Sequence, residues 1–569
     1  MIDLKKTPQT LLDAYRGNAQ QRLESLRAFR LPYWGHWALL AEVFHPRRYR
    51  AFVTPNQYAR GVPLNQSIVD ETGLLAARTC ATGMLSGLTS PTRPWFTLGV
   101  FGHDELPEGP AKIWLAECTS RMLQVYAKSN LYQSLGTVYH DDCVFGSTCI
   151  LQYEDPEDIV RFYVPAMGEF FFGLDGRLEV DTIYREFPYT ISEAVKAFGL
   201  ENLSPSTQQL AKTPGALDTE IIFGHAIEPN TISYLAFTEL PYIVPPKFGY
   251  REIYWEQATS SGQRTGTIVK ACGFNEQMHS GFRWDVTSND AYGRSPGMDG
   301  MPANRQLQIE QRRKAEAIDK MVRPPMVASM AMKNEPQDML PGGVTFVASM
   351  DGAGFKPAYQ VEPRIGELME DLKEVQARLK EVFFVDLFMM ISQLDTVRTA
   401  TEIDARREEK LIQLGPVIER TERELDKIIQ RTFAIMLRKG LFPPPPPELA
   451  GATITPQYVS MLAEAQRAAS TSIIERMVQF VGSIMGVKPD VLDNIDTDKM
   501  VDIYGDRLGA PPEMMRAVKD ILALRQQRAQ EQQQQAALAT GSVAAQGAQT
   551  LSQTDVGGGQ NALQMMLGS

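Results

Sequence analysis

The stretch GMLSGLTSPTRPWFTL occupies Gly83 to Leu98. It continues an apolar, small-residue segment that predicts a buried helix over Ile68–Leu85. Pro91 and Pro94 exclude a continuing helix, so residues 90–94 are expected to form a loop. This stretch therefore marks the end of a buried helix and the turn that leaves it.

The length and composition of the whole chain favour a soluble protein of several domains. The chain has 569 residues, of which 43% are hydrophobic and 22% are charged. No run of 18 or more apolar residues occurs, and the first residues lack the apolar stretch of a signal peptide, so no membrane partner is expected. Five cysteines without a CxxC pair favour a reducing compartment, the cytoplasm.

The net charge of −11 restricts the possible partners. A protein that binds DNA tightly usually carries a basic surface. The acidic balance therefore disfavours tight or sequence-specific DNA binding, but it is compatible with loose passage of DNA.

Hydrophobic periodicity predicts helices separated by a β-rich region, hence an α+β, predominantly helical fold. A capping box at Thr190–Glu193 predicts a short helix through Phe198, and Asp175-Gly176 predicts a hairpin. The strands expected in one small antiparallel sheet are Ser147–Tyr153, Ile159–Val164, Glu169–Leu174 and Leu178–Phe187. The other helices expected up to residue 438 are Leu11–Phe29, Pro110–Lys128, Met298–Val322, Pro363–Ile391 and Val417–Arg438. In the helix over 298–322, one apolar face is expected to hold Leu307, Ile318, Met321 and Val322. In the helix over 363–391, spacings of three and four predict an apolar seam of Ile365, Leu368, Leu372, Val375, Leu379 and Val382.

Prolines divide the C-terminal region. Gly415-Pro416 predicts a kink or break, and Pro443–Pro447 predicts a stiff connector. Thr455-Pro456 predicts the start of a helix that runs to about Met485. Beyond Gln530 the chain is rich in Gln, Ala and Gly and is expected to be disordered.

Motifs of catalysis are missing from the sequence. It has no GxxxxGK[ST] loop, no HExxH, no GxSxG and no Cys/His set with metal spacing, so no cofactor, metal or enzymatic activity is expected. His140-Asp141-Asp142-Cys143 is one cluster of chemically active residues. In an extended segment adjacent side chains point to opposite faces, so no joint site is expected there.

Five segments carry a resemblance to a known family. They are Gly83–Leu98, YGRSPGMDGMP (Tyr292–Pro302), RTATEI (Arg398–Ile403), YVSMLAEAQR (Tyr458–Arg467) and LDNIDTDKMV (Leu492–Val501). In this order and spacing, together with the hairpin region, the chain resembles the head-to-tail connector (portal) proteins of short-tailed bacteriophages over about residues 10–530.

The resemblance implies a homo-oligomeric, dodecameric ring at one capsid vertex of the virion. Double-stranded DNA would pass through it during packaging and ejection without sequence specificity. Implied protein partners are the terminase large subunit, tail adaptor proteins, and the major capsid and scaffold proteins. Assembly would take place in the host cytoplasm.

The family plan also implies a division of the chain. The expected regions are a first wing segment at 1–189, stem helix 1 at 190–202, clip at 203–296, stem helix 2 at 297–323, channel loop at 324–360, a second wing segment at 361–447, crown helices at 448–530 and a disordered tail at 531–569.

One face of the second stem helix is basic, and on this plan Arg305, Arg312 and Arg323 are expected to face the DNA channel. The structural alternative is a solvated face with ion pairs between Arg312 and Glu316 and between Asp319 and Arg323. Two other functions remain open at this point: a DNA-packaging enzyme subunit (nuclease or ATPase), and a capsid or scaffold protein without a channel.

Overall fold

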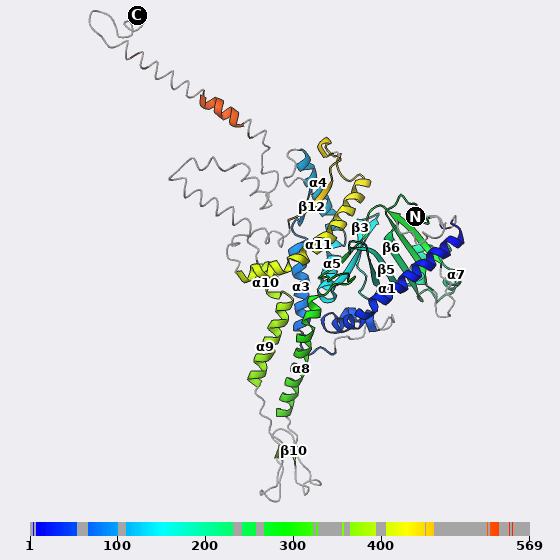
Figure 1. Cartoon of the computed structure of the whole chain (residues 1–569), viewed down its shortest axis with the longest axis vertical. Coiled ribbons are helices and arrows are strands. Elements are labelled where there is room, and N and C mark those ends of the chain that lie inside the picture. Colours follow the sequence, from blue (N-terminus) through cyan, green and yellow to red (C-terminus); the bar gives the residue numbers. More distant parts are fainter. Residues whose placement is uncertain are drawn as a thin grey trace, which may run out of the picture. The chain divides into compact units, whose positions relative to one another are not determined.

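The computed structural model describes residues 4, 7–53, 66–100, 110–230, 242–257, 267–322, 326–327, 356–357, 365–393, 405–449, 451–459, 521, 524–533, 546 and 549. The chain divides into two compact units. The first comprises Met1–Gly99, Cys118–Pro443 and Ile454–Arg476, and the second comprises Val100–Glu117, Pro444–Thr453 and Met477–Ser569. Most described elements lie in the first unit (Figure 1).

Helices and strands alternate along the chain. The α-helices are α1 (Gln9–Phe44), α2 (Pro46–Val53), α3 (Thr72–Leu88), α4 (Pro110–Lys128), α5 (Leu131–Phe145), α6 (Ile191–Phe198), α7 (Pro205–Ala211), α8 (Pro296–Val322), α9 (Ile365–Val382), α10 (Val385–Gln393) and α11 (Ala405–Arg438). The strands are β1 (Phe96–Val100), β2 (Ser147–Asp155), β3 (Ile159–Tyr163), β4 (Phe170–Leu174), β5 (Val180–Thr190), β6 (Glu220–Pro229), β7 (Tyr250–Glu256), β8 (Ile268–Phe274), β9 (His279–Arg283), β10 (Met326–Val327), β11 (Lys356–Pro357) and β12 (Ile454–Tyr458).

The predicted strands exist, but they do not form one sheet. Strands β4-β5-β6-β7-β8 form a five-stranded antiparallel sheet, whereas β3-β2-β9 form a separate three-stranded sheet. The split arises because β2 pairs with β9, from Ser147 opposite Arg283 to Leu151 opposite His279. Long-range pairing of this kind leaves no local signal in the sequence.

The expected boundary between wing and clip is wrong as a structural division. Strand β5 pairs with β6 over eight residue pairs, from Ile183–Ile227 to Thr190–Glu220. Residues of the expected first wing segment, 1–189, and of the expected clip, 203–296, therefore belong to one sheet. Residues 203–296 are not a separate module in the described structure, because their strands continue a sheet that β4 and β5 begin.

The expected first stem helix at 190–202 is also wrong. The predicted capping box is present, since Thr190 Oγ1 accepts from Glu193 N at 3.3 Å and Glu193 Oε2 accepts from Thr190 N at 3.0 Å. However, α6 has only eight residues and ends at Gly199. Its apolar side chains pack on the sheet in one cluster with Phe223 and Tyr254, so α6 is a short covering helix.

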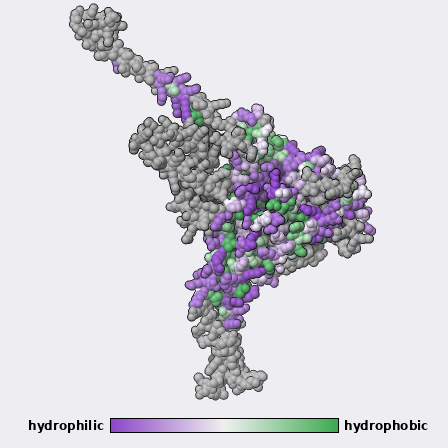
Figure 2. Space-filling view, viewed as in Figure 1, coloured by the Kyte–Doolittle hydropathy of each residue, from purple (hydrophilic) through white to green (hydrophobic). Residues whose placement is uncertain are grey.

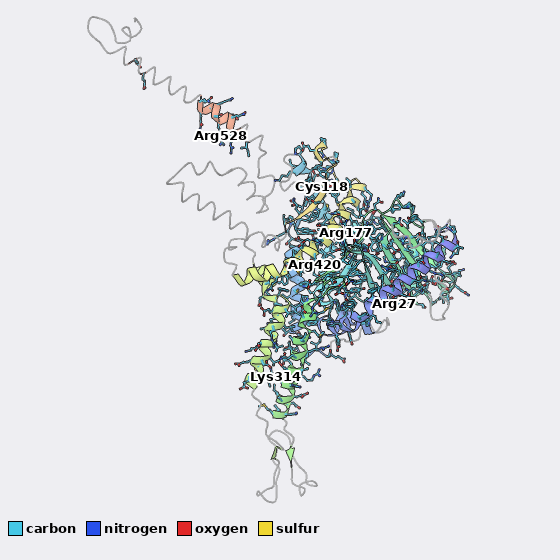
Figure 3. The ribbon with its side chains drawn as sticks, viewed as in Figure 1. Arg27, Cys118, Arg177, Lys314, Arg420 and Arg528 are labelled. Carbon is cyan, nitrogen blue, oxygen red and sulfur yellow. The ribbon has the colours of Figure 1, made fainter. Side chains whose placement is uncertain are left out.

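Helix α1 covers the opposite face of the five-stranded sheet (Figure 1). Leu12, Tyr15 and Leu23 of α1 share a buried cluster with Ile253 and Trp255 of β7. Because side chains alternate along a strand, Tyr254 between them faces α6. Arg27 of α1 also binds Glu186 of β5 at 2.6 Å, and Figure 3 labels this arginine on the helix. The predicted amphipathic helix over 11–29 is confirmed, although α1 extends to Phe44.

Helix α3 contacts five other helices, namely α1, α5, α8, α9 and α10. Its buried residues are mostly small, including Gly73, Ala77 and Gly83. A Cβ at Gly83 would overlap the Cβ and ring of Phe388 on α10. Small side chains therefore let several helix backbones approach one another here.

Three local predictions in the described residues need correction. The helix predicted over 363–391 is divided into α9 and α10 at Phe384, whose φ is 55°. Helix α11 continues through Pro416, with no break in its described extent. Residues Ile454–Tyr458, expected to begin a helix, pair instead with β1, because Val459 N donates to the carbonyl of Trp95.

Other expectations lie wholly or largely outside the described residues. They concern the segments RTATEI and LDNIDTDKMV, most of YVSMLAEAQR, the channel loop, the crown helices and the tail. All five cysteines are described and buried, and none of them forms a disulfide.

Replacing Gly83 by Ala should destabilise the protein. The added Cβ meets the base of the Phe388 side chain, which cannot rotate away, so we expect a loss of about 1–3 kcal/mol. Gly136→Ala on α5 is the matched control. Its Cβ would meet Leu85 at an ordinary 3.8 Å, so the change should be neutral or stabilising by up to about 1 kcal/mol. Urea denaturation of both variants tests this, and equal stability would contradict it.

Candidate functional site

Helix α8 begins on the C-terminal turn of α5. Ser295 precedes Pro296 and caps the helix, since its Oγ accepts from Met298 N at 3.1 Å and donates to Val144 O at 2.7 Å. A Cβ at Gly297 would lie 2.6 Å from the carbonyl oxygen of Val144, so only glycine permits this approach. The YGRSPGMDGMP segment therefore fixes where α8 starts.

A polar node then joins α8, α9 and the start of α3. Gln308 Oε1 accepts from the backbone N–H groups of Val69 and Asp70 at 2.7 and 2.9 Å. The Asp70 carboxylate in turn accepts from Gln311 of α8 at 2.8 Å and from Gln376 of α9 at 2.9 Å. Isolated glutamines on a helix carry no sequence signal for this role, so sequence reasoning missed the node.

Beyond the node, α8 and α9 lie side by side as an antiparallel pair (Figure 1). The predicted apolar seam of α9 is confirmed at Leu372, Val375 and Leu379, which are buried. On α8 no residue after Gln308 is buried among those described up to Val322. This half of α8 is thus largely exposed in the single chain.

The surface of this helix pair is hydrophilic, with scattered apolar side chains (Figure 2). Ile318, Met321 and Val322, predicted to share an apolar face with Leu307, are 40%, 50% and 72% exposed. Leu307 alone of these four is buried. The apolar face of α8 is therefore covered at Leu307 and exposed from Ile318 to Val322.

The predicted channel residues share one helix face where they are described. Arg305 and Arg312 are both exposed, on the side away from Leu307, and Arg323 lies outside the described residues. Arg305 lies close enough to His36 of α1 to lower the pKa of that imidazole, although burial and Arg294 contribute more. The structure thus brings two of the three predicted arginines onto one exposed face.

The alternative of an ion-paired helix face finds no support in the described part of α8. Arg312 and Glu316 form no ion pair there, and Arg305 has no acidic partner either. Helix α8 carries five basic and four acidic residues, and α9 carries three basic and five acidic residues. The net charge of the α8–α9 pair is therefore close to zero, and its arginines are local positive charges. Figure 3 labels Lys314 on the same half of α8.

The His140 cluster also needs correction. Residues 131–145 form helix α5, which the sequence did not predict, so this cluster is not extended. Asp141 is buried and pairs with Arg48, at 3.1 Å from Nε and 2.6 Å from Nη2. Burial raises the pKa of the neighbouring Asp142 to about 8, with Asp141 adding to the effect. Among the described residues, no three metal-binding side chains lie together in a group that could hold a metal ion.

None of the described helices combines the length and the apolar character needed to cross a membrane.

Comparison with known proteins identifies the family. The family model described as bacteriophage head to tail connecting protein matches residues 16–515. The chain therefore belongs to this family of virion connectors, and the resemblance seen in the five segments is confirmed.

Two relatives are similar over nearly their whole length. The portal protein of Salmonella phage epsilon15 is 36% identical over 538 residues, covering 94% of this chain and 95% of that protein. The probable portal protein of Bordetella phage BPP-1 is 37% identical over 524 residues, covering 91% and 92%.

Among solved structures, a chain from the virion of a native gene transfer agent particle is 10% identical with a TM-score of 0.33, over 77% of this chain and 88% of that one. At this level the similarity adds nothing to the assignment.

Replacing Asp70 by Asn should loosen the node. Burial opposes ionisation, but hydrogen bonds from Thr72, Gln376 and Gln311 hold the pKa of Asp70 below its usual 3.8. The stabilisation is therefore present above that pH and is lost as the pH falls through the lowered value. Solvent access limits the effect to about 1 kcal/mol.

Thermal unfolding between neutral and acidic pH measures this. Asp70→Asn should lower the unfolding temperature at neutral pH and reduce its fall in acid. The control is Asp371→Asn, an exposed acid on α9. If both variants gave the same curve as the parent chain, the node would have no part in stability.

Proposed function

We propose that this chain is a portal subunit, which forms a ring at one vertex of a phage capsid and lets double-stranded DNA pass. The observation that carries the proposal is the family match over residues 16–515, together with two portal relatives aligned over more than nine-tenths of both chains. Coverage of this extent supports a shared role for the whole chain, beyond a shared domain.

We assign the stem of this subunit to α8 and α9. The family plan requires two long helices with a module between them, and residues 190–202 are too short and too closely packed on a sheet. Helices of 27 and 18 residues, locked together by Asp70 at one end, meet the requirement. The clip is then the segment between them, residues 323–364, instead of 203–296.

The charge balance favours the passage of DNA over tight binding of DNA. DNA carries one negative charge per about 1.7 Å of its axis, so a strongly basic channel would hold it. A chain of net charge −11, with Arg305 and Arg312 as local positive points on α8, guides DNA weakly and lets it move. Arg323 continues the same helix face by sequence and belongs to the same proposal.

The remaining elements of the proposal follow from the role. The ring is dodecameric, and it docks the terminase large subunit during packaging and tail adaptor proteins afterwards. Contacts with the major capsid and scaffold proteins place it in the virion. The role requires no catalytic activity, cofactor or metal.

Negative-stain images of the purified full chain test the assignment. We expect rings with a central hole. Monomers with nuclease or ATPase activity, or closed shells, would contradict the proposal and would favour a packaging enzyme or a capsid protein instead.

Charge reversal tests the channel face. Arg305→Glu and Arg312→Glu should reduce DNA packaging or DNA retention, because each adds a repelling charge to every subunit of the ring. Arg177→Glu is the control, since this arginine is exposed in the turn between β4 and β5. Particle DNA content after complementation gives the readout. Full heads with both stem variants would exclude this face from the channel.

A further inference from the structure

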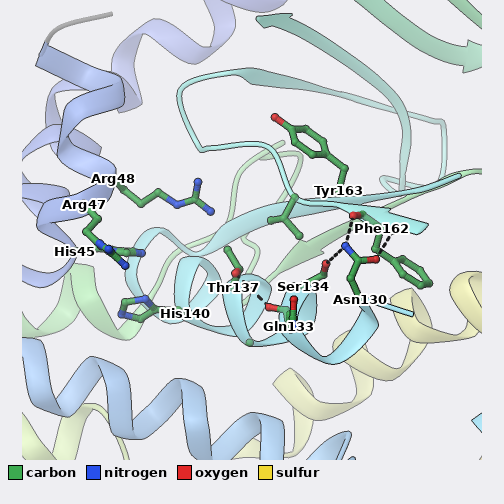
Figure 4. Close-up of a pocket in the computed structure, with 12 residues that line it drawn as sticks. His45, Arg47, Arg48, Asn130, Gln133, Ser134, Thr137, His140, Phe162 and Tyr163 are labelled. Carbon is green, nitrogen blue, oxygen red and sulfur yellow. Dashed lines mark hydrogen bonds between the residues drawn. The ribbon is translucent and has the colours of Figure 1, made fainter. Parts of the chain in front are cut away.

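A cavity of about 710 Å³ opens between α5, the start of α2 and the end of β3, far in sequence from the stem (Figure 4). Its volume falls in the range of about 300–1,000 Å³ that small-molecule sites occupy. Gln133, Ser134, Thr137 and His140 line it from one face of α5, since they recur at helical spacing. Its wall is therefore polar along α5, whereas Phe162 and Val164 add apolar surface.

Arginines make this cavity positive. Arg48 uses Nε and Nη2 to bind the buried Asp141, and a guanidinium has further N–H groups to donate. Arg47 lines the same cavity and is exposed, and no described carboxylate pairs with it. Asp141 itself is 1% exposed and does not line the cavity, so the surface presents more positive than negative charge.

Two neutral histidines lie beside the arginines. The rings of His45 and His140 lie 4.0 Å apart. Burial, followed by the positive charges nearby, lowers the pKa of His45 to about 2 and that of His140 to about 4. Both rings are therefore neutral at neutral pH. His140 Nε2 is sealed from solvent and has no hydrogen-bond partner among the described residues.

Two arginine side chains at one recess fit an oxygen-rich anion, because the guanidinium group matches the geometry of phosphate oxygens. On another part of the wall lies Tyr163, 40% exposed and with Arg185 over its ring at 4.7 Å. Figure 4 shows its phenol ring and the arginines as parts of the same pocket. The cavity is larger than a lone phosphate needs.

We propose that this cavity binds the phosphate group of a nucleotide-sized ligand, with Arg47 and Arg48 as its donors. Duplex DNA is disfavoured as the occupant, because tight duplex binding uses several spaced phosphate contacts and this is a single recess. The proposal is independent of the portal assignment, since it concerns one subunit and no ring contact.

Thermal unfolding of the full chain in inorganic phosphate, against sodium chloride of equal ionic strength, tests the site. Phosphate should raise the unfolding temperature saturably and chloride should not. Arg47→Gln should weaken phosphate binding about tenfold, since it removes a charge-assisted hydrogen bond. Arg177→Gln, the exposed control, should bind as the parent chain does. Equal effects of phosphate and chloride, or an unchanged affinity in Arg47→Gln, would overturn the proposal.

A second variant and a chemical probe locate the site. Thr137→Phe places a ring in the cavity while leaving α5 a helix, and it should abolish the phosphate effect. Phenylglyoxal modifies accessible arginines, so phosphate should protect Arg47 from it, but not Arg177, as read by mass spectrometry. Equal protection of both arginines would mean nonspecific screening and would overturn the proposal.

Competition distinguishes the sources of the phosphate. If a deoxynucleoside monophosphate binds more tightly than inorganic phosphate, and Thr137→Phe abolishes that binding, the natural ligand is a free nucleotide. If only a single-stranded oligonucleotide binds more tightly than inorganic phosphate, the phosphate group belongs to a DNA strand. An acidic peptide that binds where neither phosphate ligand does would overturn the proposal in favour of a protein partner.

Discussion

Close packing against α3 is the constraint on which the rest of the structure depends. The helix carries small residues where α10 crosses it, and Gly83 lies against the base of Phe388. Gly73 meets Asn304 of α8 and Phe44 of α1 in the same way, since a Cβ there would lie 2.9 Å from each side chain. Two glycines on one helix therefore set how near α1, α8 and α10 lie to α3.

The direction of α8 and α9, the proposed stem helices, follows from that packing. The helical conformation is interrupted at Phe384, between α9 and α10. On one side of the interruption the ring of Phe383 packs against that of Phe44, with ring centres 5.3 Å apart. On the other side Phe388 packs against Gly83. This break places α9 beside α8, and Asp70 then joins both helices to the start of α3. The α8–α9 pair is held by the packed helices around it and by the contacts of three glutamines with Asp70.

Local features were predictable from the sequence and long-range pairing was not. Capping at Thr190, the hairpin at Asp175, the helix at 298–322 and the seam of α9 all rest on short-range patterns, and the structure contains each of them. The joining of β5 to β6, the pairing of β12 with β1, and the helix α5 depend on partners distant in sequence. Of the candidate site, the exposed face with Arg305 and Arg312 was predicted, while the Asp70 node was not, because glutamines at helix positions look like ordinary solvated residues.

We propose that the α8 face with Arg305 and Arg312 meets the passing DNA. The most direct test places a photo-crosslinking amino acid at position 312, and at position 177 as a control, in assembled virions. Ultraviolet light should link DNA to the subunit at position 312 and not at position 177. Virions filled with DNA that show no crosslink at position 312, or equal crosslinks at both positions, would contradict the account.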